Sequence, residues 1–233
     1  MKFGNQNFIL SGSVIKNGLI LCLDATSSFV SSSYGWSGDR INWYSVVGSS
    51  PVLYNSPTYT SSFGGNVLFD GYTQYGVFNN STALNNMTLG DFFIGIWFKT
   101  LDTEADMLSN GIGSAGNYLL MSYQTKLRGH LWTNGSVAVV DSNKVVNDNN
   151  WHFGCQVVTG STLQLYVDGV YDNSTSIGGT RGVVNSVSYL ASRGGVASSN
   201  ISGAIAQVLV YNRALSSSEI ASLYSGSKGR FGL

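Results

Sequence analysis

The chain alternates between short apolar runs and clusters of Gly, Asn and Ser. Strand-like runs occur at residues 19–23, 67–69, 92–99, 118–122, 152–158, 162–167 and 205–211. Within one of them Leu163, Leu165 and Val167 fall on one face of an extended strand and polar or amphipathic residues fall on the other. Many short strands separated by turn-forming residues predict an all-β sandwich or jelly roll.

Asp168-Gly169 directly follows the most regular of these runs. A two-residue hairpin turn requires positive φ at its central residues, which Gly adopts freely and Asp tolerates. The dipeptide therefore predicts a tight β-hairpin at the end of this strand.

One helix is predicted near the C-terminal end of the sequence. Ser216 and Glu219 have the spacing of a capping box, and Leu215 and Ile220 have the spacing of a hydrophobic staple. Gly226 is the expected stop. A helix this short is marginal alone, so we expect it to dock on the sandwich through Ile220, Leu223 and Tyr224.

Composition limits the classes of protein to which the chain can belong. The 233 residues suffice for one large sandwich, and we expect a polar N-terminal arm over residues 1–14 and a single domain over 15–233. Twelve basic and twelve acidic residues cancel without a Lys/Arg run, which argues against nucleic-acid binding. No apolar run is long enough for a signal peptide or a membrane span. The sequence therefore predicts synthesis in a cytoplasm without membrane association.

Cys22 and Cys155 both lie in apolar, strand-like runs. Buried free thiols behave as small hydrophobic side chains, and nothing else in the sequence indicates an oxidising compartment. The sequence favours two free thiols and leaves a disulfide open.

A set of stretches in a characteristic order resembles a known family. Residues 18–25, 43–45, 55–59 and 65–71 resemble the first half of laminin G-like domains of the concanavalin A-like lectin/glucanase superfamily. Residues 148–152, 165–169 and 203–216 resemble the second half. The resemblance covers roughly residues 15–225. It implies a two-sheet antiparallel jelly-roll sandwich with one short C-terminal helix.

Catalysis is not favoured by the acidic residues. Glycosidases that retain configuration use two carboxylates about 5 Å apart, and Glu104 and Glu219 are the sequence's two glutamates. With Glu219 assigned to a helix cap, the remaining cluster is Asp102-Thr103-Glu104-Ala105-Asp106. A solvated loop is the favoured interpretation, and a cation site or a catalytic pair stays open. His130 and His152 lie in no nucleophile motif, and His152 is expected to be structural.

A bound metal ion is not favoured either. The resemblance implies an acid after Gly-x-Ile in relatives that bind calcium, and Ala206 and Gln207 stand there instead. Asp70 beside Gly71 could ligate a cation, but an Asp-Gly turn explains it equally well. We therefore expect no cofactor, with calcium as the open alternative.

Two regions are candidate contact sites. The first is a Gly- and Ser-rich loop with Tyr34, Trp36, Asp39 and Arg40, which could recognise a glycan or a protein, or could fold back over one end of the sandwich. The second is an apolar pair, Leu209 and Tyr211, which points outward if Val208 and Val210 face the core. That pair could cover a neighbouring subunit or lie under the N-terminal arm or the terminal helix.

The predicted function of the chain depends on its resemblance to known domains. The early Leu-Asp-Ala, the Trp-Tyr stretch and the closing residues 228–233 resemble compact domains of bacteriophage virion proteins. This implies a non-catalytic virion structural protein, in a capsid decoration, fibre or tail, that docks on other virion proteins as a homo-oligomer. The alternative is a carbohydrate-binding adhesin that recognises bacterial surface glycans.

Overall fold

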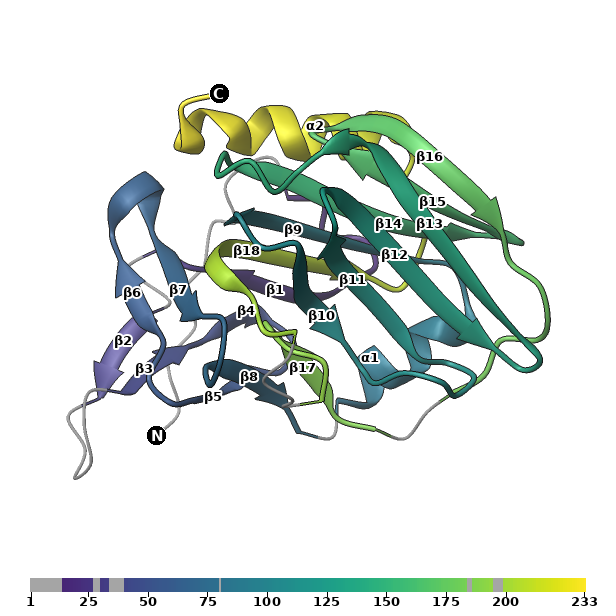
Figure 1. Ribbon diagram of the computed structural model, residues 1–233, viewed down its shortest axis with the longest axis horizontal. Coiled ribbons are helices and arrows are strands. Elements are labelled where there is room, and N and C mark those ends of the chain that lie inside the picture. The colour runs from purple at the N-terminus through teal and green to yellow at the C-terminus, as the bar shows by residue number, and fades with distance from the viewer. Residues whose placement is uncertain (1–13, 27–29, 34–39, 80, 184–185, 195–198) are drawn as a thin grey trace.

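The computed structural model describes residues 14–26, 30–33, 40–79, 81–183, 186–194 and 199–233; for residues 30–33, 40 and 41 it describes the backbone alone. Most strands belong to two antiparallel sheets that face each other as a sandwich (Figure 1). This confirms the predicted all-β jelly-roll class. In the described part of the chain, no helix is both long and apolar enough to cross a membrane.

The nine-stranded sheet has the order β16-β15-β14-β9-β18-β1-β4, with β7 paired to β18 and β6 paired to β7. Its strands are β1 (Leu19–Asp24), β4 (Ser45–Val47), β6 (Thr58–Thr60), β7 (Asn66–Asp70), β9 (Phe92–Thr100), β14 (His152–Thr159), β15 (Thr162–Val167), β16 (Val170–Ser176) and β18 (Ser202–Tyr211).

The seven-stranded sheet has the order β13-β12-β11-β10-β17-β8-β5. Its strands are β5 (Val52–Tyr54), β8 (Tyr75–Phe78), β10 (Glu104–Ser109), β11 (Tyr118–Tyr123), β12 (Lys126–Thr133), β13 (Ser136–Val145) and β17 (Ser188–Leu190). A separate hairpin consists of β2 (Val30–Ser33) and β3 (Arg40–Trp43). The helices are α1 (Thr82–Asn86) and α2 (Ser217–Ser227), with 3₁₀ turns at Ser62–Gly64, Met87–Leu89 and Lys228–Phe231.

Both faces of the nine-stranded sheet are buried at its central strand β9. Alternate residues of β9 enter the core between the sheets: Phe92, Ile94, Ile96 and Phe98. Phe93 and Trp97 point to the other face, into a second cluster with residues of α2. A strand covered on both sides reads as a continuous apolar run, which is why residues 92–98 show no clear alternation. By contrast, β15 buries Leu163, Leu165 and Val167 between the sheets, as predicted.

Helix α2 forms with the predicted cap. The Ser216 side chain accepts a hydrogen bond from the Glu219 backbone N–H, and the Glu219 carboxylate accepts one from Ser216 N–H. Leu215, Ile220 and Leu223 are buried in the outer cluster. Tyr224 stacks on Trp97 with 5.6 Å between ring centroids. The expected stop at Gly226 is wrong, because the helix continues to Ser227 and passes into the 3₁₀ turn Lys228–Phe231.

Leu209 and Tyr211 point away from the core between the sheets, as the alternation predicts, but they are not exposed to a neighbouring subunit. The two side chains are 1% and 0% exposed and lie in the outer cluster with α2, against Val14 and Ile15. Tyr211 packs edge-to-face on Phe93, with ring centroids 5.7 Å apart. The alternative placement beneath the terminal helix is therefore the one observed, and this pair offers no surface to another subunit.

The strand order settles the open question of the cysteines, which are both free. In the sheet register Cys22 lies opposite Leu209, Leu209 opposite Gly95, and Gly95 opposite Cys155. Two strands therefore separate the thiols, a span of roughly 14 Å at ordinary strand spacing. A disulfide requires Cα atoms within about 7 Å. Burial raises the pKa of the Cys22 thiol to about 12, so it is unreactive.

Candidate functional site

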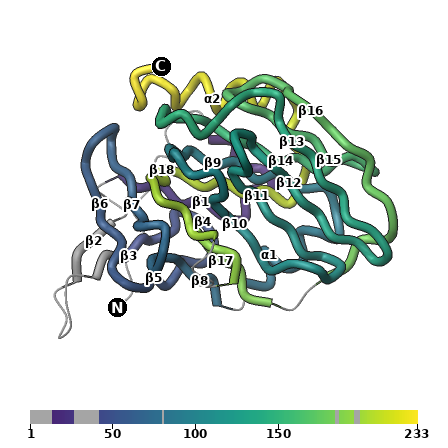
Figure 2. The backbone as a smooth tube through the Cα atoms, in the orientation of Figure 1, coloured from purple at the N-terminus to yellow at the C-terminus, as the bar shows by residue number. Residues whose placement is uncertain are grey.

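An open cleft of about 500 Å³ lies on the outer face of the nine-stranded sheet. Figures 1 and 2 show the β6–β7 hairpin standing to one side of the sheets, with its tip near the C-terminal end of the chain. We call this space the hairpin cleft. It is lined by Thr60, Ser62, Phe63, Asn66, Leu68, Lys99, Thr100, Leu101, Asp102, Asn149, Trp151, Ser202, Gly203 and Ala204.

Phe63, at the tip of the hairpin, has an unusual backbone conformation. Its φ is 55° and its ψ is 35°, in the left-handed region that a bulky side chain rarely adopts. The side chain is nevertheless 45% exposed. Its ring meets Trp151 edge-to-face at 5.8 Å, and the Lys99 ammonium lies 5.9 Å from its centroid. The fold thus holds an aromatic ring at the cleft wall at a cost in backbone strain, which is typical of binding sites.

Arg230, from the 3₁₀ turn after α2, holds the hairpin tip in place. Its Nε donates to the Phe63 carbonyl at 2.7 Å, and its Nη2 donates to the Gly65 carbonyl. Its Nη1 lies 2.8 Å from Asp24 Oδ1, and Gln207 donates to the other carboxylate oxygen of Asp24 at 2.9 Å. The C-terminal end of the chain therefore positions the Phe63 ring.

The opposite wall comes from the loop before β14. Asn149 has a φ of 63°, and its N–H donates to the Thr100 carbonyl at 3.1 Å. The Asn149 side chain is exposed at the rim of the cleft. Trp151 is nearly buried and packs on Phe231 with 4.6 Å between ring centroids. The loop thus supplies a buried aromatic wall and an exposed amide.

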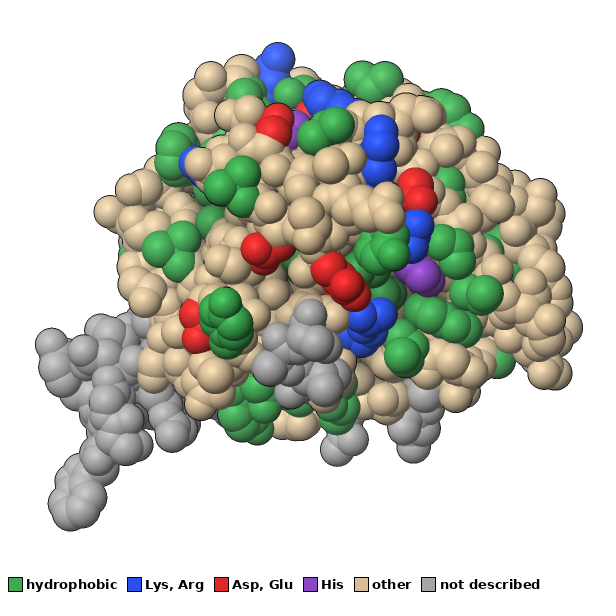
Figure 3. Space-filling view, viewed as in Figure 1, with side chains coloured by type: hydrophobic (Ala, Val, Ile, Leu, Met, Phe, Trp, Pro, Cys, Tyr) green, Lys and Arg blue, Asp and Glu red, His purple; other side chains and the backbone are tan. Residues whose placement is uncertain are grey.

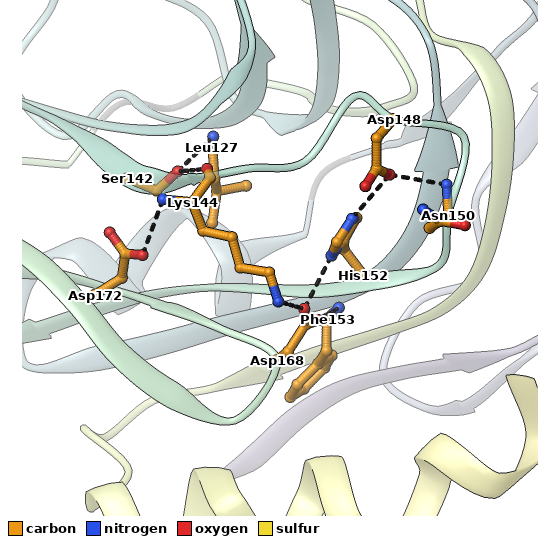
Figure 4. Close-up of polar contacts among 9 residues, drawn as sticks. All are labelled: Leu127, Ser142, Lys144, Asp148, Asn150, His152, Phe153, Asp168 and Asp172. Carbon is orange, nitrogen blue, oxygen red and sulfur yellow. Dashed lines mark hydrogen bonds and ion pairs between the residues drawn. The ribbon is translucent and has the colours of Figure 1, made fainter. Parts of the chain in front are cut away.

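A charged network secures this loop (Figure 4). His152 Nδ1 lies 2.9 Å from Asp168 Oδ2, and its Nε2 lies 3.1 Å from Asp148 Oδ1. Lys144 Nζ approaches the same Asp168 oxygen at 2.6 Å, and the Phe153 N–H donates to Asp168 Oδ1 at 2.8 Å. Because a carboxylate occupies each ring nitrogen, His152 has no nitrogen left to serve a nucleophile. Its position supports the structural role predicted from the sequence.

The pKa shifts in this network agree with a charged cluster. Burial acts to lower the pKa of His152, but the hydrogen bonds and charges of Asp168 and Asp148 outweigh burial and raise it. Burial acts to raise the pKa of Asp168, and hydrogen bonds from His152, Lys144 and the Phe153 N–H lower it instead. The pKa of Asp148 falls to about 2, against the effect of burial, through hydrogen bonds from Asn150 and His152.

The acidic cluster at 102–106 is the predicted solvated loop only at its start, where residues 103 and 104 are exposed. Glu104 begins β10, and Asp106 is 0% exposed. Arg193 approaches both acids, with Nη2 3.0 Å from Glu104 and Nε 3.1 Å from Asp106. Burial raises the pKa of Asp106 to about 7 although Arg193 opposes it. One guanidinium thus binds two of the three carboxylates of the cluster.

The carboxylates of Asp102 and Asp70 accept hydrogen bonds from backbone N–H groups of the fold. The Asp102 carboxylate accepts a hydrogen bond from the Ser202 N–H at the cleft. Asp70 Oδ1 accepts hydrogen bonds from the backbone N–H groups of three following residues, Tyr72, Thr73 and Gln74, at 2.9–3.0 Å. Burial opposes these bonds, yet they lower the pKa of Asp70 to about 2. The Asp-Gly turn is therefore the observed role. Among the described residues, no group of three or more His, Cys, Asp or Glu side chains could hold a metal ion.

The outer face of the seven-stranded sheet carries charged side chains of both signs (Figure 3). Arg128 pairs with Asp141, with Nε 2.5 Å from Oδ1, and its guanidinium carbon lies 3.7 Å from the Tyr123 ring centroid. His130 stacks on Trp132 at 4.9 Å. Burial, together with the charge of Arg128 and of a second arginine, lowers the pKa of His130 to about 4. These charges largely neutralise one another.

The predicted contact loop and the observed cleft are different places. Tyr34, Trp36 and Asp39 lie outside the described residues, and Arg40 begins β3 with its side chain undescribed, so that prediction stays untested. Phe63 and its cleft were not predicted from the sequence. Phe63 lies in a Ser- and Gly-rich turn, the same kind of signal that drew attention to the earlier loop.

Several solved structures have a fold similar to that of this chain. The binding domain of Paraclostridial Mosquitocidal Protein 1 is 18% identical over 89% of this chain and 52% of its own, with a TM-score of 0.67. The binding domain of botulinum neurotoxin DC in complex with SialylT is 11% identical over 89% and 51%, with a TM-score of 0.66. A structure from work on ganglioside-dependent cell entry of botulinum neurotoxin type C is 10% identical over the same shares, with a TM-score of 0.66.

The chain spans about half the length of these solved structures, and at these identities the likeness shows the fold alone. They are clostridial toxin domains rather than bacteriophage proteins. A search of curated proteins finds no match.

A family model matches residues 70–221, more than half of the 233 residues. The match spans β8 to the first turn of α2 and includes Glu104, Asp106 and the whole His152 network. The chain belongs to the concanavalin A-like lectin/glucanases superfamily.

Proposed function

We propose that the chain is a non-catalytic recognition module that binds a saccharide in the hairpin cleft. The observation that carries this proposal is Phe63, a half-exposed aromatic ring kept in a left-handed backbone conformation and fixed by Arg230. Strain of this kind costs about 1–3 kcal/mol and persists where the surrounding structure enforces it. A core or a plain turn has no need of an exposed phenyl ring there.

The lining of the cleft suits a sugar. The apolar face of a pyranose ring stacks on aromatic rings, and its hydroxyls need donors and acceptors nearby. Phe63 supplies the ring, while Asn149, Lys99 and the Thr60 and Ser62 hydroxyls supply polar groups around it. The volume of about 500 Å³ lies within the range of small-molecule sites.

The similar solved structures support the same class of ligand. One is a botulinum neurotoxin domain in complex with SialylT, and another concerns cell entry that depends on two ganglioside molecules. Gangliosides carry saccharide headgroups. Since this chain matches only about half of each structure, saccharide binding by this chain rests on its own cleft.

The non-catalytic part of the proposal rests on the charged residues. Asp106 is fully buried beside Arg193, so a substrate cannot reach the two carboxylates together as a glycosidase would require. His152 has both ring nitrogens engaged by carboxylates. The solved structures compared above are binding domains.

The finer prediction of a virion structural protein rests on resemblance alone, and the candidate contact pair Leu209 and Tyr211 is buried and gives it no support. Quantitative mass spectrometry of purified particles tests it. Many copies per particle would support a structural role in the virion, a few copies would fit a glycan-binding fibre or tail component, and absence would contradict a virion location.

A Phe63→Gly variant tests saccharide binding without unfolding the turn. Glycine adopts positive φ freely, so we expect the free energy of unfolding to stay within about 1 kcal/mol of the wild type while the affinity for the saccharide falls about 10-fold or more. A glycan array identifies the ligand, and calorimetric titration measures the affinity.

Tyr44→Ala is the matched control, because Tyr44 is a half-exposed aromatic residue outside the cleft. It should bind as the wild type does. Equal binding by wild type and Phe63→Gly would place the ligand elsewhere and refute the role of the hairpin cleft.

A further inference from the structure

We infer that the saccharide taken by the hairpin cleft carries an anionic group that pairs with the Lys99 ammonium. This inference rests on the proposed saccharide-binding function and adds the chemical class of the ligand. Lys99 belongs to β9, opposite Ala204 of β18, and both residues line the cleft.

Lys99 is an uncompensated cation. Its ammonium lies 5.9 Å from the centroid of the Phe63 ring. Within the part of the chain that the structure describes, it forms no ion pair with a carboxylate, whereas Arg128, Lys144, Arg181, Arg193, Arg213 and Arg230 each do. Arg230, the other cation near the hairpin tip, is fully engaged by Asp24 and two backbone carbonyls. The positive charge available to a ligand in the cleft is therefore that of Lys99.

The carboxylate that lines the cleft does not cancel this charge by pairing with it. Asp102 accepts a hydrogen bond from the Ser202 N–H, and its own N–H donates to Thr100 Oγ1 at 2.9 Å. Asp102 thus closes the turn after β9, and its carboxylate is stabilised by the Ser202 N–H. Burial raises its pKa despite these bonds.

The position of Lys99 beside the Phe63 ring gives a physical reason for the cleft to prefer one class of saccharide. A sugar that stacks on Phe63 covers the ring near which the ammonium lies, and so removes water from the ammonium. A neutral sugar leaves that loss of hydration poorly compensated. An anionic substituent compensates it with a charge-assisted hydrogen bond, which is stronger than a neutral one. The cleft should therefore prefer anionic over neutral saccharides of the same scaffold.

The test compares matched ligands on one scaffold. The probes are 3′-sialyllactose, 3′-sulfolactose and lactose, with trigalacturonate and galactotriose as a second matched set, each titrated calorimetrically into the full chain. We expect at least one anionic member of a set to bind about 10-fold more tightly than its neutral counterpart, and this advantage to shrink as salt is added. Sialyllactose or trigalacturonate binding alone identifies a carboxylate ligand, and sulfolactose binding alone a sulfate.

Variants assign the preference to Lys99. Lys99→Gln should reduce the anionic advantage to less than about 2-fold, while Lys99→Arg should keep most of it. Lys126→Gln, which removes a positive charge from the other sheet, should bind like the wild type. Lys99 is half-buried at the surface, so thermal unfolding of these variants should match that of the wild type.

The outcomes separate this inference from the proposed function. Equal affinity for neutral and anionic probes, lost in Phe63→Gly, would overturn the anionic preference and leave saccharide binding in place. An anionic preference that survives Lys99→Gln would overturn the assignment to Lys99. Absence of binding to every saccharide on the array would refute the proposed function and this inference together.

Discussion

Gly65→Ala is expected to lower the free energy of unfolding by about 3 kcal/mol or more and to abolish saccharide binding. Gly65 has a φ of 108°, and a Cβ atom there would lie far inside van der Waals contact with the Ala25 carbonyl oxygen. The strained backbone and the overpacking each cost about 1–3 kcal/mol. Because the clash is with backbone, the hairpin tip must move, and Phe63 moves with it. Urea denaturation and calorimetric titration measure the two effects.

Gly135→Ala is the control for backbone conformation alone. Gly135 has a φ of 86°, in the hairpin turn between β12 and β13, and a Cβ there meets no atom within 4 Å. We expect a cost of about 1 kcal/mol and unchanged binding. If Gly65→Ala cost no more than this control, the close approach of Gly65 to Ala25 would not constrain the hairpin.

Asp168→Asn is expected to cost about 3 kcal/mol at pH 5.5 and clearly less at pH 9. The substitution removes the carboxylate that binds His152, Lys144 and the Phe153 N–H. It leaves the nearly buried imidazolium of His152 without one of its two carboxylate partners. Loss of one partner of a buried charged pair is costly because the other stays desolvated. Urea denaturation at both pH values checks the difference.

The pH window follows from the direction of each pKa shift. The pKa of His152 is raised on folding, so its stabilising effect is complete below the unfolded value of about 6.5 and is lost as pH rises through the folded pKa. The pKa values of Asp168 and Asp148 are lowered, so their effect is complete above about 4 and is lost as pH falls through their folded values. The network therefore stabilises the fold most between about pH 4 and 6.5.

Asp141→Asn is the matched control, because Asp141 pairs with Arg128 at a much more exposed site. It should cost less than about 1 kcal/mol at both pH values. An equal penalty for Asp168→Asn at pH 5.5 and pH 9 would show that His152 does not share in the network's stability.

Signals that act over a few residues could be predicted from the sequence. The alternation at 163–167, the Asp168-Gly169 turn and the Ser216–Glu219 cap each depend on neighbours close in the chain, and the structure contains all three. In the turn, φ is 53° at Asp168 and 78° at Gly169. The order of such segments along the chain also led to the family and the sandwich.

The features that the sequence did not predict depend on contacts between segments that are distant in the chain. Leu209 and Tyr211 alternate as an outward row would, but α2 covers that face of β18. Asp106, predicted to lie in a solvated loop, is buried in the fold, where Arg193 from a distant segment pairs with it. The free state of the two thiols follows from the strand order, which places β18 and β9 between them.

The hairpin cleft belongs wholly to the tertiary structure. Phe63, Lys99 and Trp151 come from three separate segments, and a fourth segment supplies Arg230, which holds Phe63 in a conformation that its local sequence alone would disfavour. The sequence by itself determined the most apolar strands, the Asp168-Gly169 turn, the helix cap and the family, because each depends on short-range backbone preferences and the period of apolar residues. The tertiary structure alone decided which side chains share a surface, because burial and pairing of charges depend on neighbours that chain order does not reveal.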